Sequence, residues 1–122
     1  MTTAPVYVAV VDDDQSLCRS LGRLLRAAGM QSVTYPSAEA FLADTKQPRF
    51  DCLVLDIRLG GMSGIELGLW LAAEGNRTPI IFVTAYDDAE MRLRAESAGC
   101  VAYFRKTTSG VEVLDAIRRA TG

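Results

Sequence analysis

The sequence predicts an α/β domain in which helices cover both faces of a parallel β-sheet. Five short apolar runs alternate along the chain with five segments of helical character, and this alternation is typical of a parallel sheet. The chain has 122 residues, of which 49% are apolar and 23% are charged, as in a globular protein rather than a disordered one. Because single domains commonly have about 100–150 residues, we expect residues 1–122 to form one domain.

The expected strands are short runs of apolar, often β-branched residues, which is typical of strands buried on both faces of a sheet. Val6–Val11 is an uninterrupted run that ends at three consecutive aspartates. The other expected strands are Gln31–Tyr35, Cys52–Ile57, Pro79–Val83 and Val101–Phe104. No repeat or linker interrupts their succession.

Segments with helical patterns follow these runs. Apolar residues recur at helical spacing over Leu17–Ala28, Gly29 stands where that helix would end, and Ser37 suits the N-cap of a second helix. Ile65–Leu71 alternates almost like a strand, but a parallel sheet needs a crossover of about ten residues there, so we interpret it as helical. The remaining expected helices are Gly64–Glu74, Asp88–Ala98 and Ser109–Ala120.

The charge and the missing residue types exclude several functions. The net charge is −2, which does not favour a nucleic-acid-binding face. No apolar run approaches the roughly 18 residues of a membrane span, and Met1–Pro5 lacks the positive charge of a secretory signal. We therefore expect a cytoplasmic protein that contacts neither nucleic acid nor membrane.

The chain contains no histidine, which excludes histidine-dependent nucleophiles, zinc sites built on imidazole, and a phosphohistidine of its own. Three widely spaced cysteines, Cys18, Cys52 and Cys100, have apolar neighbours. We expect them to be buried free thiols.

Polar residues gather where the expected strands end. In open parallel sheets, ligands bind at the carboxyl ends of the strands, and the residues there are Asp12, Asp13, Asp14, Asp56, Thr84 and Lys106. Crowded carboxylates repel one another unless a cation intervenes, and Mg²⁺ takes oxygen ligands. A carboxylate can also accept a phosphoryl group as a nucleophile, helped by a metal, a lysine and a hydroxyl. The pattern predicts such a phosphoryl-transfer site.

Taken singly, these residues have ordinary roles. Asp14 suits the N-cap of the first helix, Thr84 a turn, and Lys106 a solvated surface. One cap does not account for three aspartates, however, and Asp56 within an apolar strand would be costly to bury without a partner. Their occurrence at equivalent strand ends favours the functional interpretation.

Four segments resemble the motifs of the receiver domain of two-component response regulators. They are Val10–Asp14, Leu55–Gly64, Val83–Ala85 and Phe104–Lys106, within a resemblance that runs from about residue 7 to 120. The resemblance implies a flavodoxin-like sheet of strand order 2-1-3-4-5. It also implies a signalling module rather than a turnover enzyme.

The resemblance further implies a role for each site residue. Asp56 would accept a phosphoryl group from a sensor histidine kinase or a phosphotransfer protein. Asp13, Asp56 and the backbone carbonyl of Arg58 would bind Mg²⁺ or Mn²⁺, and Asp12 would do so through a water. Thr84 would bind a phosphoryl oxygen.

Lys106 would pair with another phosphoryl oxygen, and the rotamer of Tyr103 would report activation. Output, and a homodimer interface, would use the fourth helix, fifth strand and fifth helix. In this family the residues two after the phosphorylated Asp and two after the Thr tune dephosphorylation. Here they are Arg58 and Tyr86, which we expect to shield the acyl phosphate from water.

Two positions depart from the family pattern. Thr107 replaces the usual proline after the lysine, so we expect a trans bond there and a different aim for Lys106. Gly60 replaces the proline four residues after Asp56, and we expect it to loosen that loop.

Four other functions share part of this pattern. A haloacid-dehalogenase-type phosphatase would have an Asp where Arg58 stands, and a flavodoxin would have a hydroxyl-rich loop where three aspartates stand. A receiver-like interaction module that works without phosphate remains open. So does the N-terminal part of a longer DNA-binding regulator.

Overall fold

The computed structural model describes residues 4–85 and 88–122. Its five strands form one parallel sheet of order β2-β1-β3-β4-β5, which confirms the predicted fold class. The strands are β1 (Tyr7–Val11), β2 (Gln31–Tyr35), β3 (Cys52–Asp56), β4 (Ile80–Thr84) and β5 (Ala102–Arg105). The helices are α1 (Gln15–Ala27), α2 (Ala38–Ala43), α3 (Gly64–Ala73), α4 (Ala89–Ser97) and α5 (Gly110–Thr121).

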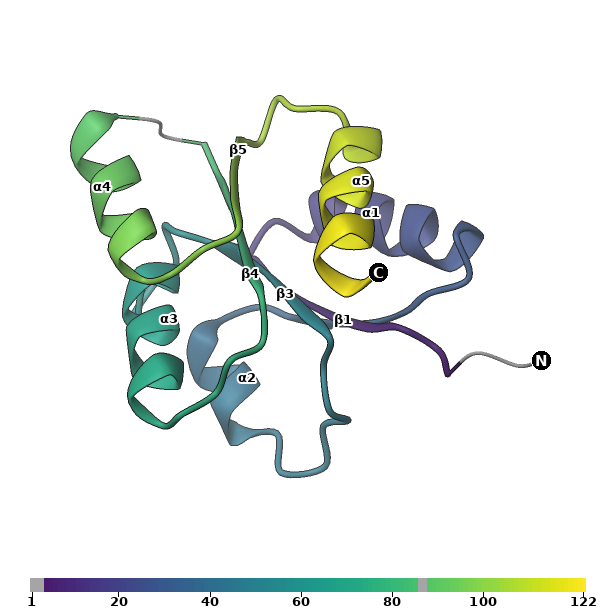
Figure 1. The fold of residues 1–122 in the computed structure, drawn as a ribbon, viewed down its shortest axis with the longest axis horizontal. Helices are drawn as coiled ribbons and strands as arrows, with labels where there is room; N and C mark the ends of the chain where they lie inside the picture. Colours follow the sequence, from purple (N-terminus) through teal and green to yellow (C-terminus); the bar gives the residue numbers. More distant parts are fainter. Residues whose placement is uncertain (1–3, 86–87) are drawn as a thin grey trace.

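The helices lie on the two faces of the sheet, with α1 and α5 on one and α2, α3 and α4 on the other (Figure 1). Strand β1 shows how the sequence fills both layers, because successive side chains point to opposite faces. Val8 and Val10 pack into the core under α1 and α5, whereas Ala9 and Val11 pack into the core under the other three helices. Burial of both faces explains the unbroken apolar run.

Side-chain caps mark where each helix begins. The residues Asp14, Ser37, Ser63, Asp88 and Ser109 each accept a hydrogen bond from a backbone N–H three residues further on. The cap predicted at Asp14 is therefore confirmed, and the first helix begins before Leu17. In the connection from β3 to β4, Ser63 and Glu66 exchange side-chain-to-backbone hydrogen bonds at the start of α3. The ambiguous segment Ile65–Leu71 is therefore helical, as interpreted.

The cysteines are free thiols, as predicted. Cys18 and Cys52 are buried, but Cys100 is only half-buried, because it follows the end of α4, where one side of the chain faces solvent. Within residues 4–85 and 88–122, the structure holds no helix that is both long and apolar enough to cross a membrane.

Candidate functional site

Four strands bring the predicted polar side chains to one edge of the sheet, the edge formed by the carboxyl ends of the strands. Asp56 and Thr84 are the last residues of β3 and β4, while Asp12 and Lys106 directly follow β1 and β5. Because β3 lies between β1 and β4, Asp56 occupies the middle of the group. The exposed fractions of Asp12 and Asp56 are both 3%, and Thr84 is fully buried. Charges so deeply buried require partners within the protein.

Lys106 supplies that partner. Its Nζ lies 3.0 Å from Asp12 Oδ1 and 2.9 Å from Asp56 Oδ2. Its backbone N–H donates to the carbonyl of Thr84 at 2.8 Å, which holds the start of the β5–α5 loop against β4. One ammonium thus bridges two carboxylates that belong to different strands.

Burial and neighbouring opposite charges shift the pKa values of Asp56 and Lys106 in opposite directions. Burial raises the pKa of Asp56 to about 6, because loss of water disfavours the carboxylate; Lys106 opposes this shift and Asp12 adds to it. Burial alone would lower the pKa of Lys106, but the hydrogen bonds from its ammonium to Asp56 and Asp12 raise it above its ordinary value. The site therefore holds more negative charge than one lysine compensates.

The carboxylates are arranged as a divalent cation would need. Asp12, Asp13 and Asp56 can each offer an oxygen such that the three oxygens lie within 4.8 Å of one another. Asp12 and Asp56 are buried, while Asp13 is exposed, which leaves one side open to solvent. An all-oxygen set with surplus negative charge fits Mg²⁺ or Mn²⁺.

Backbone hydrogen bonds fix the orientation of the two buried aspartates. The N–H of Asp14 donates to Asp12 Oδ1 at 2.9 Å, and the N–H of Arg58 donates to Asp56 Oδ1 at 3.2 Å. Behind Asp56, a Cβ at Gly64 would collide with the backbone carbonyl oxygen of Asp56. Glycine therefore lets the start of α3 pack directly against the strand end that carries the central carboxylate.

One residue that bears on the site, Glu39, belongs to no sequence motif. Glu39 of α2 accepts a hydrogen bond from the N–H of Met62 at 2.7 Å, and Gly61 beside it has a φ of +80°. The carboxylate thereby ties the β3–α3 loop to a neighbouring helix. The looser loop expected from Gly60 stays a prediction. The hydrogen bond between Glu39 and Met62 restrains this loop, and no local motif indicates it.

The remaining predicted residues lie around this centre. The guanidinium carbon of Arg92 lies 4.8 Å from the ring centroid of Tyr103, and Tyr103 packs against the core under α4. Arg58 is exposed, and Tyr86 lies outside the described residues. No cis peptide bond occurs among the described residues, so the bond before Thr107 is trans as expected.

Comparison with known proteins identifies the family of this chain. The family model described as "Response regulator receiver domain" matches residues 8–118. The response regulator protein TmoT of Ectopseudomonas mendocina is 37% identical over 93% of the chain and 51% of its own length. Nodulation protein W of Bradyrhizobium diazoefficiens is 41% identical over 93% of the chain and 50% of its own length. The chain thus spans about half the length of these relatives.

Solved structures agree with the sequence comparison. FixJ-N is 34% identical, with a TM-score of 0.86 over 98% of this chain and 95% of that one. A response regulator receiver protein from Burkholderia phymatum is 41% identical, with a TM-score of 0.82 over 96% and 95% of the two chains. The family match, the strand order and the carboxylate edge together show that this chain belongs to the response regulator receiver domains of two-component systems.

Proposed function

We propose that the chain is a phospho-accepting receiver that takes a phosphoryl group onto Asp56 from a sensor histidine kinase or a phosphotransfer protein. The observation that carries the proposal is the Lys106 ammonium, which contacts both Asp56 and Asp12 at a carboxylate-rich strand edge. An Asp56 oxygen attacks phosphorus, the P–N bond of the donor's phosphohistidine breaks, and its electron pair stays on the imidazole nitrogen. The donor histidine lies outside these 122 residues, which contain none.

The proposal assigns the surrounding residues to binding and charge compensation. Asp13, Asp56 and the Arg58 carbonyl would hold Mg²⁺ or Mn²⁺, with Asp12 acting through a water. When bound, the ion supplies positive charge to the transferring phosphoryl oxygens. Lys106 pairs with one phosphoryl oxygen, and the buried Thr84 hydroxyl donates to another. Every group named here lies at the same end of the sheet.

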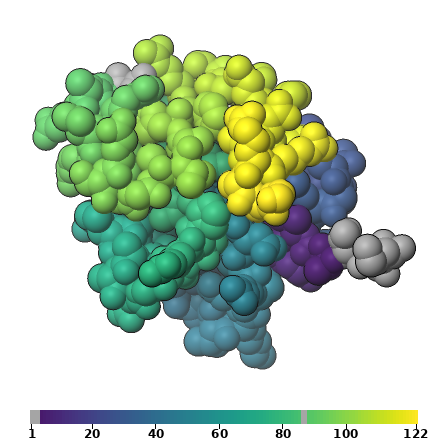
Figure 2. Space-filling view, in the orientation of Figure 1, coloured from purple at the N-terminus to yellow at the C-terminus, as the bar shows by residue number. Residues whose placement is uncertain are grey.

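The switch would act through Thr84 and Tyr103. A phosphoryl group on Asp56 draws Thr84 toward it, and the space left beside β4 favours a different rotamer of Tyr103 under Arg92. The output surface would be α4, β5 and α5, whose colours run from green to yellow across Figure 2. Exposed apolar residues occur on this part of the chain at Leu93, Val101 and Val111, which supports a homodimer interface there.

Arg58 and Tyr86 would shield the acyl phosphate from water. Arg58 is exposed two residues after Asp56, so its long side chain can cover the modified carboxylate. We expect the phosphorylated protein to lose phosphate more slowly than the double variant Arg58→Ala, Tyr86→Ala, measured by loss of acid-labile label. Equal or faster loss from the unmodified sequence would contradict the shielding role.

A second candidate concerns the output. The transcriptional regulatory proteins TdiR of Thauera aromatica and FixJ of Rhizobium meliloti are 36% and 35% identical to this chain, and the matches cover 50% and 56% of their lengths. We propose on this basis that the receiver controls transcription in the cytoplasm, through a DNA-binding domain or partner rather than through its own surface.

The test of the phosphoryl acceptor uses acetyl phosphate and Mg²⁺. The unmodified chain should gain acid-labile phosphate, and Asp56→Asn should gain none, because an amide cannot form the acyl phosphate. Asp115→Asn, on the exposed side of α5, is the matched control and should label normally. Labelling that persists in Asp56→Asn would move the acceptor elsewhere. A wild-type chain that neither labels nor binds beryllofluoride would instead be the phosphate-independent module.

A further inference from the structure

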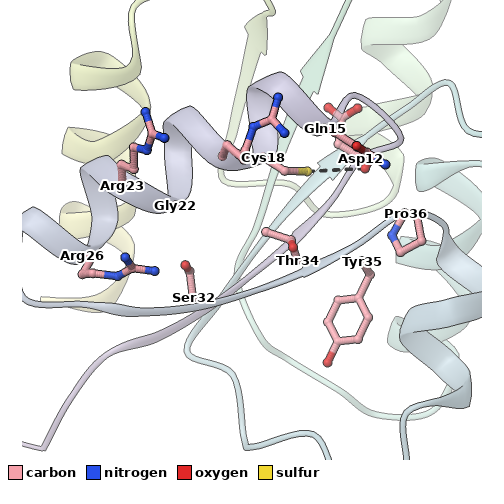
Figure 3. A pocket seen from close by; sticks show the side chains of 11 residues that line it. Asp12, Gln15, Cys18, Gly22, Arg23, Arg26, Ser32, Thr34, Tyr35 and Pro36 are labelled. Atoms are coloured by element: carbon pink, nitrogen blue, oxygen red, sulfur yellow. Dashed lines mark hydrogen bonds between the residues drawn. The ribbon is translucent and has the colours of Figure 1, made fainter.

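A groove lined by arginines, unlike the carboxylate-rich site around Asp56, runs between α1 and the outermost strand β2. Its volume is about 530 Å³, and its lining includes Arg19, Arg23 and Arg26 from the helix and Ser32 and Thr34 from the strand. Figure 3 shows the helix and the strand as the two walls. Apart from Asp12, which lines one end of the groove, no residue assigned to the proposed phosphorylation of Asp56 belongs to it.

The helical wall is strongly basic. Arg19, Arg23 and Arg26 stand at i, i+4 and i+7, so they share one side of α1 over about 10 Å of its length. All three are exposed, and among residues 4–85 and 88–122 no carboxylate forms an ion pair with any of them. In a chain with net charge −2, three neighbouring guanidiniums that form no ion pair with a described residue make a local site for anions.

The strand wall offers backbone hydrogen-bonding groups. Strand β2 is an outermost strand of the sheet and, within the part of the chain that the structure describes, pairs only with β1. The N–H of Gln31 donates to the carbonyl of Val6, and the carbonyl of Tyr35 accepts from Asp12, so alternate residues use their backbone groups toward β1. The backbone groups of Ser32 and Thr34 therefore point to the open side, where another strand could pair.

Side-chain directions join the two walls into one surface. Ser32 and Thr34 point toward α1, while Tyr35 points to the opposite face (Figure 3), where it packs against Phe41 and Phe50. A strand added beside Ser32 and Thr34 would send every second side chain to the same face, about 6.6–6.8 Å apart. Along α1 the three arginines are separated by about 6.0 and 4.5 Å, which is shorter than that spacing, and their long side chains can span the difference.

We propose that this groove docks an extended acidic segment of a partner protein, which adds to β2 as a sixth strand and directs alternate carboxylates at Arg19, Arg23 and Arg26. Charge complementarity selects the acidic side chains, and the open backbone edge selects a peptide. A polyphosphate such as DNA would use the arginines but not the strand edge. Asp12 lines one end of the groove and belongs to the carboxylate cluster, which Lys106 only partly neutralises, so the acidic side chains of the segment would lie away from that end.

Binding of a synthetic peptide tests the proposal. The probe is a fluorescein-labelled peptide in which glutamate alternates with threonine, measured by anisotropy against this chain. We expect saturable binding that weakens as NaCl is raised, with amide shifts at Ser32 and Thr34 in NMR spectra. The triple variant Arg19→Gln, Arg23→Gln, Arg26→Gln should bind about tenfold more weakly, since each partly exposed pair contributes modestly.

Matched controls separate this site from general attraction between charges. The triple variant Arg77→Gln, Arg118→Gln, Arg119→Gln removes the same charge from exposed positions elsewhere and should bind the peptide like the unmodified chain. A peptide N-methylated at alternate residues keeps its carboxylates but cannot donate to the strand edge, and it should bind several-fold more weakly. The proposal is overturned by equal losses in both triple variants, by full binding of the N-methylated peptide, or by no binding at millimolar peptide. Binding of duplex DNA through the same arginines, without the peptide, would overturn it in favour of nucleic acid.

Discussion

Two charged regions of the molecule are the edge formed by the carboxyl ends of the strands, which holds Asp56, and the groove beside β2. Both include Asp12, yet their charges are stabilised differently. At the edge, two carboxylates are almost fully buried and share one ammonium. In the groove, the arginines are exposed to water and form no ion pairs within the described chain. Water stabilises the second set, whereas the protein itself must stabilise the first. Substitutions at the edge should therefore change the stability of the fold, and substitutions in the groove should change only binding.

The largest effect is expected for Lys106→Met. The substitution leaves Asp12 and Asp56 buried without their shared partner, and breaking a buried pair in this way costs about 3 kcal/mol. We expect the free energy of unfolding, measured with urea at pH 8 in the presence of EDTA, to fall by about that amount. Lys46→Met removes an exposed lysine and should change it by less than about 0.5 kcal/mol. Equal stability of the two variants would mean that water, and not Lys106, compensates the carboxylates.

Asp56→Asn is expected to raise the free energy of unfolding, whereas Lys106→Met lowers it. In the metal-free protein the pKa of Asp56 is raised from 3.8 to about 6, so the folded state binds more protons than the unfolded state between those values. Stability is then fully present below about pH 4 and declines as the pH rises to about 6. Asp56→Asn removes that decline and should stabilise the metal-free protein at pH 8 by about 1–3 kcal/mol. Urea unfolding across this pH range measures both effects, and parallel pH profiles would contradict them.

Glu39 provides an intermediate case, because it is exposed but its carboxylate has a specific backbone partner. The hydrogen bond from Met62 N–H lowers the pKa of Glu39, so the carboxylate remains ionised at neutral pH. Glu39→Ala should release the loop that leads away from Arg58 and weaken Mg²⁺ binding by up to about tenfold, as for other groups that support metal ligands. The change is measured by Mg²⁺ titration of the fluorescence of Trp70.

The control for this prediction keeps the acceptor and removes the charge. Glu39→Gln still offers an oxygen to Met62 N–H and should bind Mg²⁺ within about threefold of the unmodified chain. Glu90→Ala removes an exposed carboxylate from α4 and should have no effect. If Glu39→Ala binds Mg²⁺ normally, the loop is held by other contacts, such as the close packing of Gly64.

The two regions also differ in how far the sequence predicts them. Asp56, Thr84 and Lys106 could be assigned to one edge because each stands at the end of an apolar run, and parallel strands end together. The partner of Asp12 was not predictable in the same way. Lys106 lies 94 residues away along the chain, and only the packing of β5 against β4 brings it to Asp12.

Individual hydrogen bonds and the exposure of single side chains are the part that the pattern did not predict. Glu39 and Met62 are 23 residues apart, and neither belongs to a motif, so nothing local indicates their hydrogen bond. Cys100 has apolar neighbours but is half-buried, because its exposure depends on how the chain leaves α4. The spacing of Arg19, Arg23 and Arg26 is visible in the sequence, yet the groove exists only because α1 lies beside an edge strand.

The smallest effect on stability is expected in the groove itself. Arginine and glutamine have similar helix propensities, and the side chains of Arg19, Arg23 and Arg26 are exposed. Each single substitution to glutamine should therefore change the free energy of unfolding by less than about 0.5 kcal/mol, measured with urea at pH 8. A loss above about 1 kcal/mol would show that the arginines hold α1 against β2. They would then be stabilised by the protein, like the charges around Asp56, and the difference between the two regions would disappear. Small changes in stability together with weaker peptide binding would instead show that the fold tolerates these charges and that a partner uses them.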